Sequence, residues 1–307
     1  MNIIDKNFFS LVNEIKSLDE KELYYKIRSS FDSIPDETKT SCMNFFNQFG
    51  YWGVLDVNNN NYEQIRLKQE TLTNHIDDFI WLYNHLCDYR SKKTLYSILN
   101  NWYRYDFLTT SQTREYLFDD YFDLDLVKCS SDEVIVDLGA YNGDTVLSYI
   151  KNYGVNCYKK IYCYEITPDI FSELKNNLKD LDNIEFRLKG ISDEKGSMSL
   201  INNESPSANT LSSQGGNDVS VTTLDYDIKE PITLIKADIE GFEQKAILGA
   251  KNHILNDHPK LLISVYHNNE DLWKIPKMIY DIHDDYKFYL RYNSSPIYPT
   301  EITLIAI

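Results

Sequence analysis

The sequence has no C-x-x-C pair, and its cysteines are few and odd in number. The five are scattered along the chain at Cys42, Cys87, Cys129, Cys157 and Cys163. A disulfide framework or a structural zinc site requires cysteines at short, regular spacing, so both are excluded. Scattered thiols of this kind are typical of a reduced, cytoplasmic protein.

Long hydrophobic runs are also missing. No stretch approaches the roughly 18 uninterrupted apolar residues that a membrane-spanning helix needs. The first ten residues carry Asp5 and Lys6 before a short apolar stretch and lack the layout of a signal peptide. We therefore predict no membrane span and a cytoplasmic location.

Basic residues are scarce, with 31 Lys and Arg against 47 Asp and Glu and a formal net charge of -16. A protein that binds the nucleic-acid backbone needs a cationic face, so this balance argues against a nucleic-acid partner. Hydrophobic residues make up 42% of the chain, enough to build a core. The composition indicates an acidic globular protein.

Residues 1–115 show helical spacing of apolar side chains. One amphipathic face consists of Phe8, Phe9, Leu11, Val12 and Ile15, and a second face runs over residues 76–86. Thr73 or Asn74 can cap the second helix at its start. We expect a helical N-terminal domain that binds an acceptor or mediates assembly into a homo-oligomer.

Residues 116–307 change to short apolar runs that alternate with helices. Strands are expected at 134–136, 161–164, 232–235 and 261–265, and helices at 145–152, 168–179, 243–254 and 271–283. This alternation predicts an α/β fold with a parallel sheet. The chain then ends in two β-like runs, 286–291 and 302–307, joined by a loop, which predicts a terminal antiparallel hairpin. An ordinary dinucleotide-binding domain would continue with parallel strands.

A glycine turn follows the first of these strands. The strand ends in Asp137, and the chain turns from Gly139 to Gly143 into a helix that begins near Asp144. The G-x-x-x-G spacing differs from the dinucleotide motif G-x-G-x-x-G, which directs backbone amides at a pyrophosphate. S-adenosylmethionine has no phosphate, and an acid at a strand end suits its cationic amino-acid moiety. A glycine turn with a purely structural role is the alternative.

The second strand ends in another acid, Glu165. An acid at this strand end can bind both ribose hydroxyls of a nucleoside cofactor in a bidentate contact. Ile166 can pack against the adenine, and the turn at Gly190, Ile191, Ser192 and Asp193 is expected near the adenine edge. In register with the first motif, Glu165 favours cofactor binding over a solvated carboxylate.

Further motifs follow in a fixed order. They are D-L-G-A-Y-N-G-D-T at 137–145, Y-E-I-T-P at 164–168, T-L-D at 223–225, K-A-D-I-E-G-F-E at 236–243, V-Y-H at 265–267 and E-D-L-W at 270–273. Together they resemble the FkbM family of methyltransferases from about residue 121 to the C-terminus. The resemblance implies a Rossmann-like class I methyltransferase fold, whose distinguishing end is the terminal hairpin.

The resemblance also implies S-adenosylmethionine-dependent O-methylation, with S-adenosylhomocysteine as product. The acceptor would be a small molecule or a carbohydrate: a hydroxyl of a surface-glycan sugar or of a secondary metabolite. The cofactor-binding residues expected from the motifs and their neighbours are Asp137, Gly139, Ala140, Tyr141, Asn142, Gly143, Asp144, Glu165, Ile166, Ile191, Ser192 and Asp238. Tyr141 departs from the pattern, because many methyltransferases have a second glycine there.

The candidate catalytic residues are His267, Asp238 and Glu240. A histidine has an ordinary pKa of about 6.5 and suits a general base, and Asp238 is expected to position it or to replace it. A histidine that only hydrogen-bonds Asn268 or a substrate hydroxyl is the alternative. Asp238, Glu240 and Glu243 are also hard-metal ligands by type, although no further ligand motif supports a divalent metal. For Glu243, capping of the following helix is preferred.

Two other functions fit parts of the pattern. One is a cofactor-binding or scaffold protein of the same fold that has lost catalysis, against which the acids at 137, 165 and 238 argue. The other is an NAD-dependent enzyme, which the G-x-x-x-G spacing and the terminal hairpin disfavour.

Overall fold

The computed structural model describes residues 2–49, 52–201, 203, 209–212 and 218–307. The chain forms two compact units. Unit 1 comprises Met1–Tyr116, Val265–Pro276 and Lys287–Leu304, and unit 2 comprises Leu117–Ser264, Lys277–Tyr286 and Ile305–Ile307. Within the described residues, no helix is both long and apolar enough to cross a bilayer.

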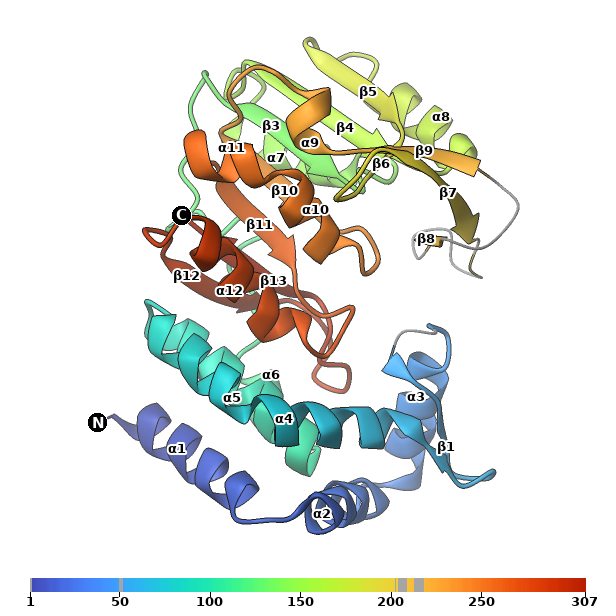
Figure 1. Cartoon of the computed structure of the whole chain (residues 1–307), viewed down its shortest axis with the longest axis vertical. Helices are drawn as coiled ribbons and strands as arrows, with labels where there is room; N and C mark the ends of the chain where they lie inside the picture. Colours follow the sequence, from blue (N-terminus) through green and yellow to red (C-terminus); the bar gives the residue numbers. More distant parts are fainter. Residues whose placement is uncertain (1, 50–51, 202, 204–208, 213–217) are drawn as a thin grey trace. The chain divides into compact units, whose positions relative to one another are not determined.

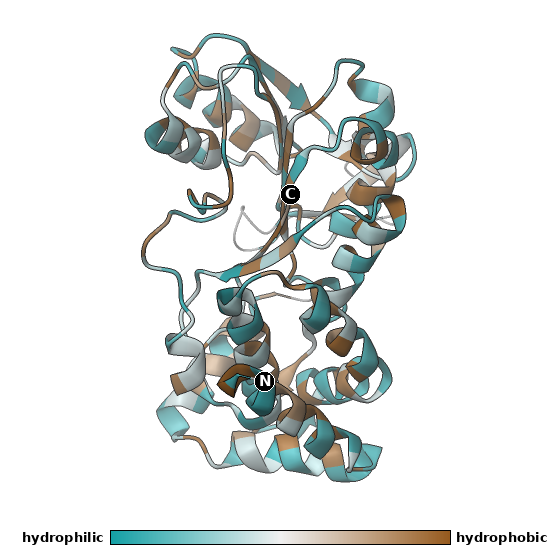
Figure 2. Cartoon of the chain, turned by 90° about the vertical axis from the view of Figure 1, so that its left-hand side faces the viewer, coloured by the Kyte–Doolittle hydropathy of each residue, from teal (hydrophilic) through white to brown (hydrophobic). Residues whose placement is uncertain are grey.

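Unit 1 is mainly helical. Its elements are α1 (Ile3–Lys16), α2 (Glu20–Asp32), α3 (Asp36–Phe46), β1 (Leu55–Asp56), β2 (Asn61–Tyr62), α4 (Glu63–His85), α5 (Tyr89–Arg104) and α6 (Phe107–Ser111). Hydrophobic and hydrophilic residues alternate around these helices, the pattern of helices that bury one face (Figure 2). Four residues of the expected face of α1 are buried, namely Phe8, Leu11, Val12 and Ile15, whereas Phe9 is only half-buried.

The N-terminal helices begin where their sequence specifies. Asn2 and Asp5 form a capping box at α1, and Asp19 and Glu22 form another at α2. The expected helix start at Thr73 or Asn74 lies within two residues of a kink in α4 at His75, whose φ of -126° and ψ of 16° lie outside the helical region. Two helical stretches meet there, so the second one begins close to the expected position. A further helical stretch, from Glu63 to the kink, precedes it.

Helix α5 joins distant parts of the chain within unit 1. Asp88 caps its first turn by accepting from the Ser91 amide, and it also pairs with Arg291 at 2.8 Å. The Ser91 hydroxyl accepts from the Leu290 amide at 2.9 Å. Strand β12 (Phe288–Tyr292) is thereby fixed along α5 (Figure 1).

The large sheet has seven strands in the order β12-β13-β11-β10-β3-β4-β5. The other members are β3 (Val134–Leu138), β4 (Lys160–Glu165), β5 (Ile184–Leu188), β10 (Leu234–Ala237), β11 (Lys260–Ser264) and β13 (Ile302–Ala306). Strand β3 is buried along its whole length, as a central parallel strand requires. The mostly parallel sheet, with the last two strands of the chain at one end, confirms the predicted fold class.

Helices and a second sheet complete unit 2. Helices α7 (Asp144–Tyr153), α8 (Pro168–Asn177), α9 (Leu224–Asp227), α10 (Glu243–Gly249) and α11 (Lys251–Asn256) belong to it, and α12 (Asp271–Ile282) spans both units. The helix expected at 243–254 is thus divided in two. A four-stranded sheet, which the sequence did not suggest, has the order β6-β9-β7-β8. Its strands are β6 (Gly190–Ile191), β7 (Gly196–Ile201), β8 (Thr210–Ser212) and β9 (Asp218–Thr222).

Candidate functional site

The carboxyl ends of three parallel strands of unit 2 meet at one edge. Leu138 of β3 pairs with Ala237 of β10 on one side and with Tyr164 of β4 on the other. The chain passes from β3 to β4 and β5 on one side, and then crosses to β10 on the other side. Such a topological switch point is where open α/β sheets bind ligands. Glu165 is the last residue of β4, and Gly139 and Asp238 directly follow β3 and β10, so all three lie at this edge of the sheet.

Gly139 is required by its surroundings. Its φ is +75°, and a Cβ atom there would lie 1.9 Å from the backbone oxygen of Asp238. The amides of Gly139 and Ala140 both donate to the Tyr164 carbonyl, at 3.1 and 2.8 Å. The turn is thus fixed tightly between β4 and β10, as the glycine motif predicted.

We expect Gly139→Ala to destabilise the chain by about 1–3 kcal/mol more than Gly154→Ala does, because only the first also creates a steric overlap. Gly154 is a matched control: its φ is +93°, and a Cβ there would meet nothing within 4 Å. Urea unfolding of both variants measures the difference. Equal losses would show that the close approach to Asp238 is absent in solution.

Glu165 connects the tip of β4 to the glycine turn. Its Oε2 accepts from the Tyr141 amide at 3.1 Å, and its Oε1 accepts from the Ile166 and Thr167 amides at 2.8 and 2.7 Å. Burial raises the pKa of Glu165, and these backbone hydrogen bonds oppose the rise. A hydrogen bond from the Thr167 side chain also opposes the rise. The expected bidentate contact of Glu165 with the ribose hydroxyls stays a prediction.

The predicted adenine-side residues lie next to this carboxylate. Leu188, the last residue of β5, pairs with Glu165. A Cβ on Gly190 would lie 3.4 Å from Ile166, and Ile166 is half-buried. Ile191 and Ser192 are buried, and the Ser192 amide donates to the Thr222 carbonyl at 2.9 Å. The apolar side chains of Ile166 and Ile191 thus come from adjacent segments of one edge.

Asp137 lies below this edge, buried beside Lys236. The two residues are paired across β3 and β10, and Lys236 Nζ lies 3.0 Å from Asp137 Oδ1. Lys236 also donates to the Gly139 carbonyl at 2.8 Å. Burial raises the pKa of Asp137 to about 6, and the ammonium of Lys236 opposes the rise. The buried ion pair is therefore hydrogen-bonded to the glycine turn through Lys236. The expected contact of Asp137 with the cofactor stays a prediction.

The remaining turn residues make fewer contacts at this edge of the sheet. Tyr141 has a φ of +45°, Asn142 accepts from the Asn177 side chain through its carbonyl, and Gly143 is the N-cap of α7. Asp144 is exposed in the first turn of α7, where a carboxylate complements the helix dipole.

Asp238 is held by a tyrosine that the sequence reasoning did not single out as a site residue. The Tyr121 hydroxyl lies 2.8 Å from Asp238 Oδ2 and 3.2 Å from Ser264 Oγ, at the end of the neighbouring strand β11. Tyr121 stands at a φ of +66°, uncommon for an aromatic residue. The start of the FkbM-like region at Tyr121 was the one signal that could have pointed to it.

The two acids after Asp238 differ in their surroundings. Glu240 is half-buried with a φ of +54°, and its carbonyl accepts from Thr210 at 2.9 Å. Glu243 is fully buried, and its carboxylate accepts from the Ile239 and Gly241 amides at 2.8 and 3.1 Å. Glu243 thus holds the loop that precedes α10.

His267 lies three residues beyond β11, in the segment of unit 1 that begins at Val265, and it is fully buried. Asp238 and Glu240 belong to unit 2. The parallel register of β10 and β11 pairs Ala237 with Ile263, so His267 follows a strand that ends beside Asp238. Its catalytic role, and those of Asp238 and Glu240, stay predictions.

Comparison with known proteins identifies the family. A family model described as the methyltransferase FkbM domain matches residues 137–293. The chain belongs to this family. No curated protein matches the chain. The FkbM-like motifs at 137–145, 164–168, 236–243 and 265–273 all lie within the matched region, so the predicted family is confirmed.

One solved structure shares the fold. An FkbM methyltransferase from Methylobacillus flagellatus has a TM-score of 0.65 and 23% identity, covering 78% of this chain. This chain spans 62% of the length of that protein. More distant similarities include Aeropyrum pernix fibrillarin with bound S-adenosyl-L-methionine (TM-score 0.38, 15% identity, 59% of this chain and 70% of that one). They also include an rRNA methylase from Streptococcus thermophilus (TM-score 0.37, 18% identity, 58% and 87%). The family supports a methyltransferase.

Proposed function

We propose that the chain is an S-adenosylmethionine-dependent O-methyltransferase that acts on a hydroxyl of a sugar, in a surface-glycan precursor, or of a secondary metabolite. The observation that carries the proposal is Glu165. Its carboxylate lies at the tip of β4 and is hydrogen-bonded to the glycine turn, at the strand end where an acid can accept from the ribose hydroxyls of a nucleoside cofactor.

The residues around Glu165 fit this cofactor by their chemistry. The turn from Gly139 to Gly143 allows a ligand to approach the backbone, Glu165 accepts from a ribose hydroxyl, and Ile166 and Ile191 offer apolar contact to an adenine. The dinucleotide alternative needs amides directed at a pyrophosphate, but here the Tyr141 amide already donates to Glu165. S-adenosylmethionine would supply an electrophilic methyl group on a sulfonium.

The acceptor hydroxyl must lose its proton as its oxygen attacks, and we assign that step to the residues after β10 and β11. In this proposal His267 takes the proton, and Asp238, oriented by the Tyr121 hydroxyl, is the alternative base. The N-terminal helices bind the acceptor or mediate assembly of the chain.

The test is calorimetric binding of S-adenosylhomocysteine to the wild type and to Glu165→Ala. Loss of a charge-assisted hydrogen bond to the ribose should cost about 1.5–3 kcal/mol, or roughly ten- to hundredfold in affinity. Glu194→Ala, which removes an exposed acid two residues beyond Ser192, should bind like the wild type.

Wild-type affinity in a folded Glu165→Ala variant would remove Glu165 from the site. Because Glu165 also holds three backbone amides, thermal unfolding of the variant must be measured alongside. Tight binding without methyl transfer to any hydroxyl would favour the catalytically inactive protein of the same fold.

A further inference from the structure

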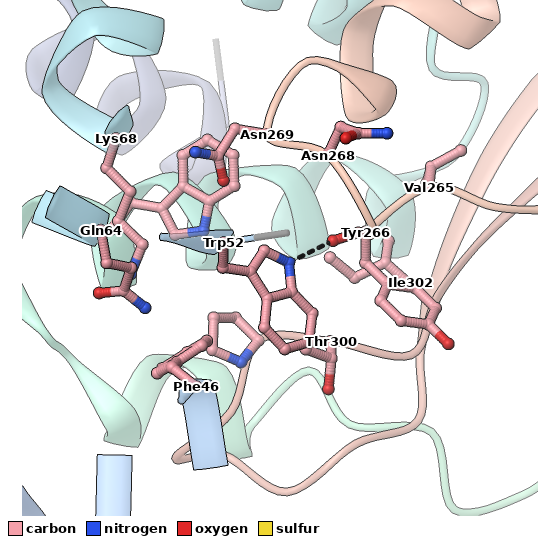
Figure 3. A pocket seen from close by; sticks show the side chains of 12 residues that line it. Phe46, Trp52, Gln64, Lys68, Val265, Tyr266, Asn268, Asn269, Thr300 and Ile302 are labelled. Carbon is pink, nitrogen blue, oxygen red and sulfur yellow. Dashed lines mark hydrogen bonds between the residues drawn. The ribbon is translucent and has the colours of Figure 1, made fainter. Parts of the chain in front are cut away.

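A small cavity lies within unit 1, and two hydrogen-bond donors from α4 line it (Figure 3). Its volume is about 20 Å³, and all of its lining residues belong to unit 1. Gln64 and Lys68 are one helical turn apart on α4 and therefore share a face. Their exposed fractions are only 1% and 3%.

Among the residues that the structure describes, neither Lys68 Nζ nor Gln64 Nε2 has a hydrogen-bond partner. The Tyr105 hydroxyl lies 3.4 Å from Gln64 Oε1, which assigns the oxygen of that amide to Tyr105 and leaves its nitrogen toward the cavity. Lys68 Nζ lies 5.2 and 5.1 Å from the ring centroids of Phe46 and Tyr105. These rings attract the cation but accept no conventional hydrogen bond. An ammonium and an amide N–H₂ thus face one cavity as donors only.

Most of the remaining wall is apolar or already hydrogen-bonded. Trp52 donates through Nε1 to the Tyr266 carbonyl at 2.8 Å, as Figure 3 shows, and the Asn268 side chain donates to Asp271 at 2.9 Å. Apolar surface comes from Trp102, Val265 and Ile302. A ligand here must bring hydrogen-bond acceptors.

We propose that this cavity binds a carboxylate group, whose two oxygens accept from Lys68 Nζ and Gln64 Nε2. A carboxylate is an acceptor-only group with two oxygens, which matches two donor side chains on one helix face. Its wall includes Tyr266 and Asn268, which flank His267 in sequence. The site is independent of the proposed function.

Acetate is the direct probe. Thermal unfolding of the full chain in increasing sodium acetate, with ionic strength held constant by sodium chloride, should show a saturable rise in Tm. Lys68→Met should abolish the rise, and Gln64→Leu should weaken acetate binding by about tenfold or more. Lys26→Met, which removes an exposed lysine of α2, is the matched control and should respond like the wild type.

The pH dependence gives a second readout that needs no variant. Burial lowers the pKa of Lys68 to about 8. The ammonium faces two titratable groups, the Cys42 thiol of α3 and the Tyr105 hydroxyl. Burial raises the pKa of Cys42 to about 11 and also raises the pKa of Tyr105. Neither titrates below pH 9, so acetate affinity should be constant between about pH 6 and 7, where acetate stays ionised, and about tenfold weaker at pH 9, as Lys68 loses its proton.

The proposal is overturned if acetate produces no specific rise in Tm, if the rise persists in Lys68→Met, or if phosphate or chloride acts as strongly at equal ionic strength. This outcome is separable from the proposed function, because acetate binding requires no cofactor. If acetate binds but S-adenosylhomocysteine does not, the carboxylate cavity stands and the proposed function falls. If S-adenosylhomocysteine binds but acetate does not, the proposed function stands and the carboxylate cavity falls.

Discussion

Replacing Lys236 by methionine is expected to lower the free energy of unfolding by about 3–5 kcal/mol, because it leaves the buried carboxylate of Asp137 without its counterion. Both side chains are almost completely buried, with exposed fractions of 4% for Lys236 and 2% for Asp137. The Gly139 carbonyl also loses its 2.8 Å hydrogen bond, so the glycine turn should loosen. Urea unfolding at pH 8 measures the loss of stability, and the affinity for S-adenosylhomocysteine measures the effect on the turn.

The pH dependence of this variant follows from the direction of the pKa shift. The pKa of Asp137 is raised from its ordinary value of 3.8 to about 6 in the folded chain, so the folded state holds this proton more tightly than the unfolded state does. The stability contributed by the protonated form is therefore complete below about pH 3.8 and is lost as pH rises toward 6. Without Lys236 to oppose it, the pKa rises further. The loss in free energy of unfolding caused by Lys236→Met should consequently be smaller at pH 5 than at pH 8.

Two further variants complete this test. Combining Asp137→Asn with Lys236→Met should recover part of the loss, because no charge then remains buried. Lys151→Met is the control: it removes the exposed ion pair with Asp119, in which Lys151 is 71% exposed, and should change stability by no more than about 0.5 kcal/mol. If Lys236→Met were as stable as Lys151→Met, the buried pair would not exist in solution as described.

His267→Ala is expected to lower kcat by roughly 10²–10⁴ with a smaller change in KM, because a general base acts on the transition state more than on the bound acceptor. Steady-state methyl transfer over a range of acceptor concentrations measures both parameters.

The control for His267 comes from the same segment. Tyr266→Phe removes a hydroxyl that lies 3.3 Å from Glu301 but keeps the backbone carbonyl that Trp52 binds. It should leave kcat within a few-fold of the wild type. If His267→Ala raises KM while kcat stays within a few-fold, the histidine binds the acceptor and the base lies elsewhere.

Local sequence was sufficient for the features that depend on neighbours along the chain. The alternation of short apolar runs with helices predicted β3, β4, β10 and β11 within about two residues, because strand and helix periods are local properties. The glycine turn was also evident from its two glycines. Only a glycine tolerates the φ of +75° at position 139 so close to the Asp238 carbonyl. The order of motifs, each at a strand end, then indicated the family.

Only the tertiary structure decided which distant side chains meet. Asp137 read as a ligand for a cation, but the crossover from β3 to β10 pairs it with Lys236, almost a hundred residues away in sequence. Strand order likewise brings the Tyr121 hydroxyl to Asp238 and Ser264. In the helical unit, Gln64 and Lys68 were ordinary polar positions until packing buried them against Phe46 and Trp52. Hydrophobic periodicity specifies which face of an element is buried, but it does not specify the partner element, because that depends on how the elements pack together.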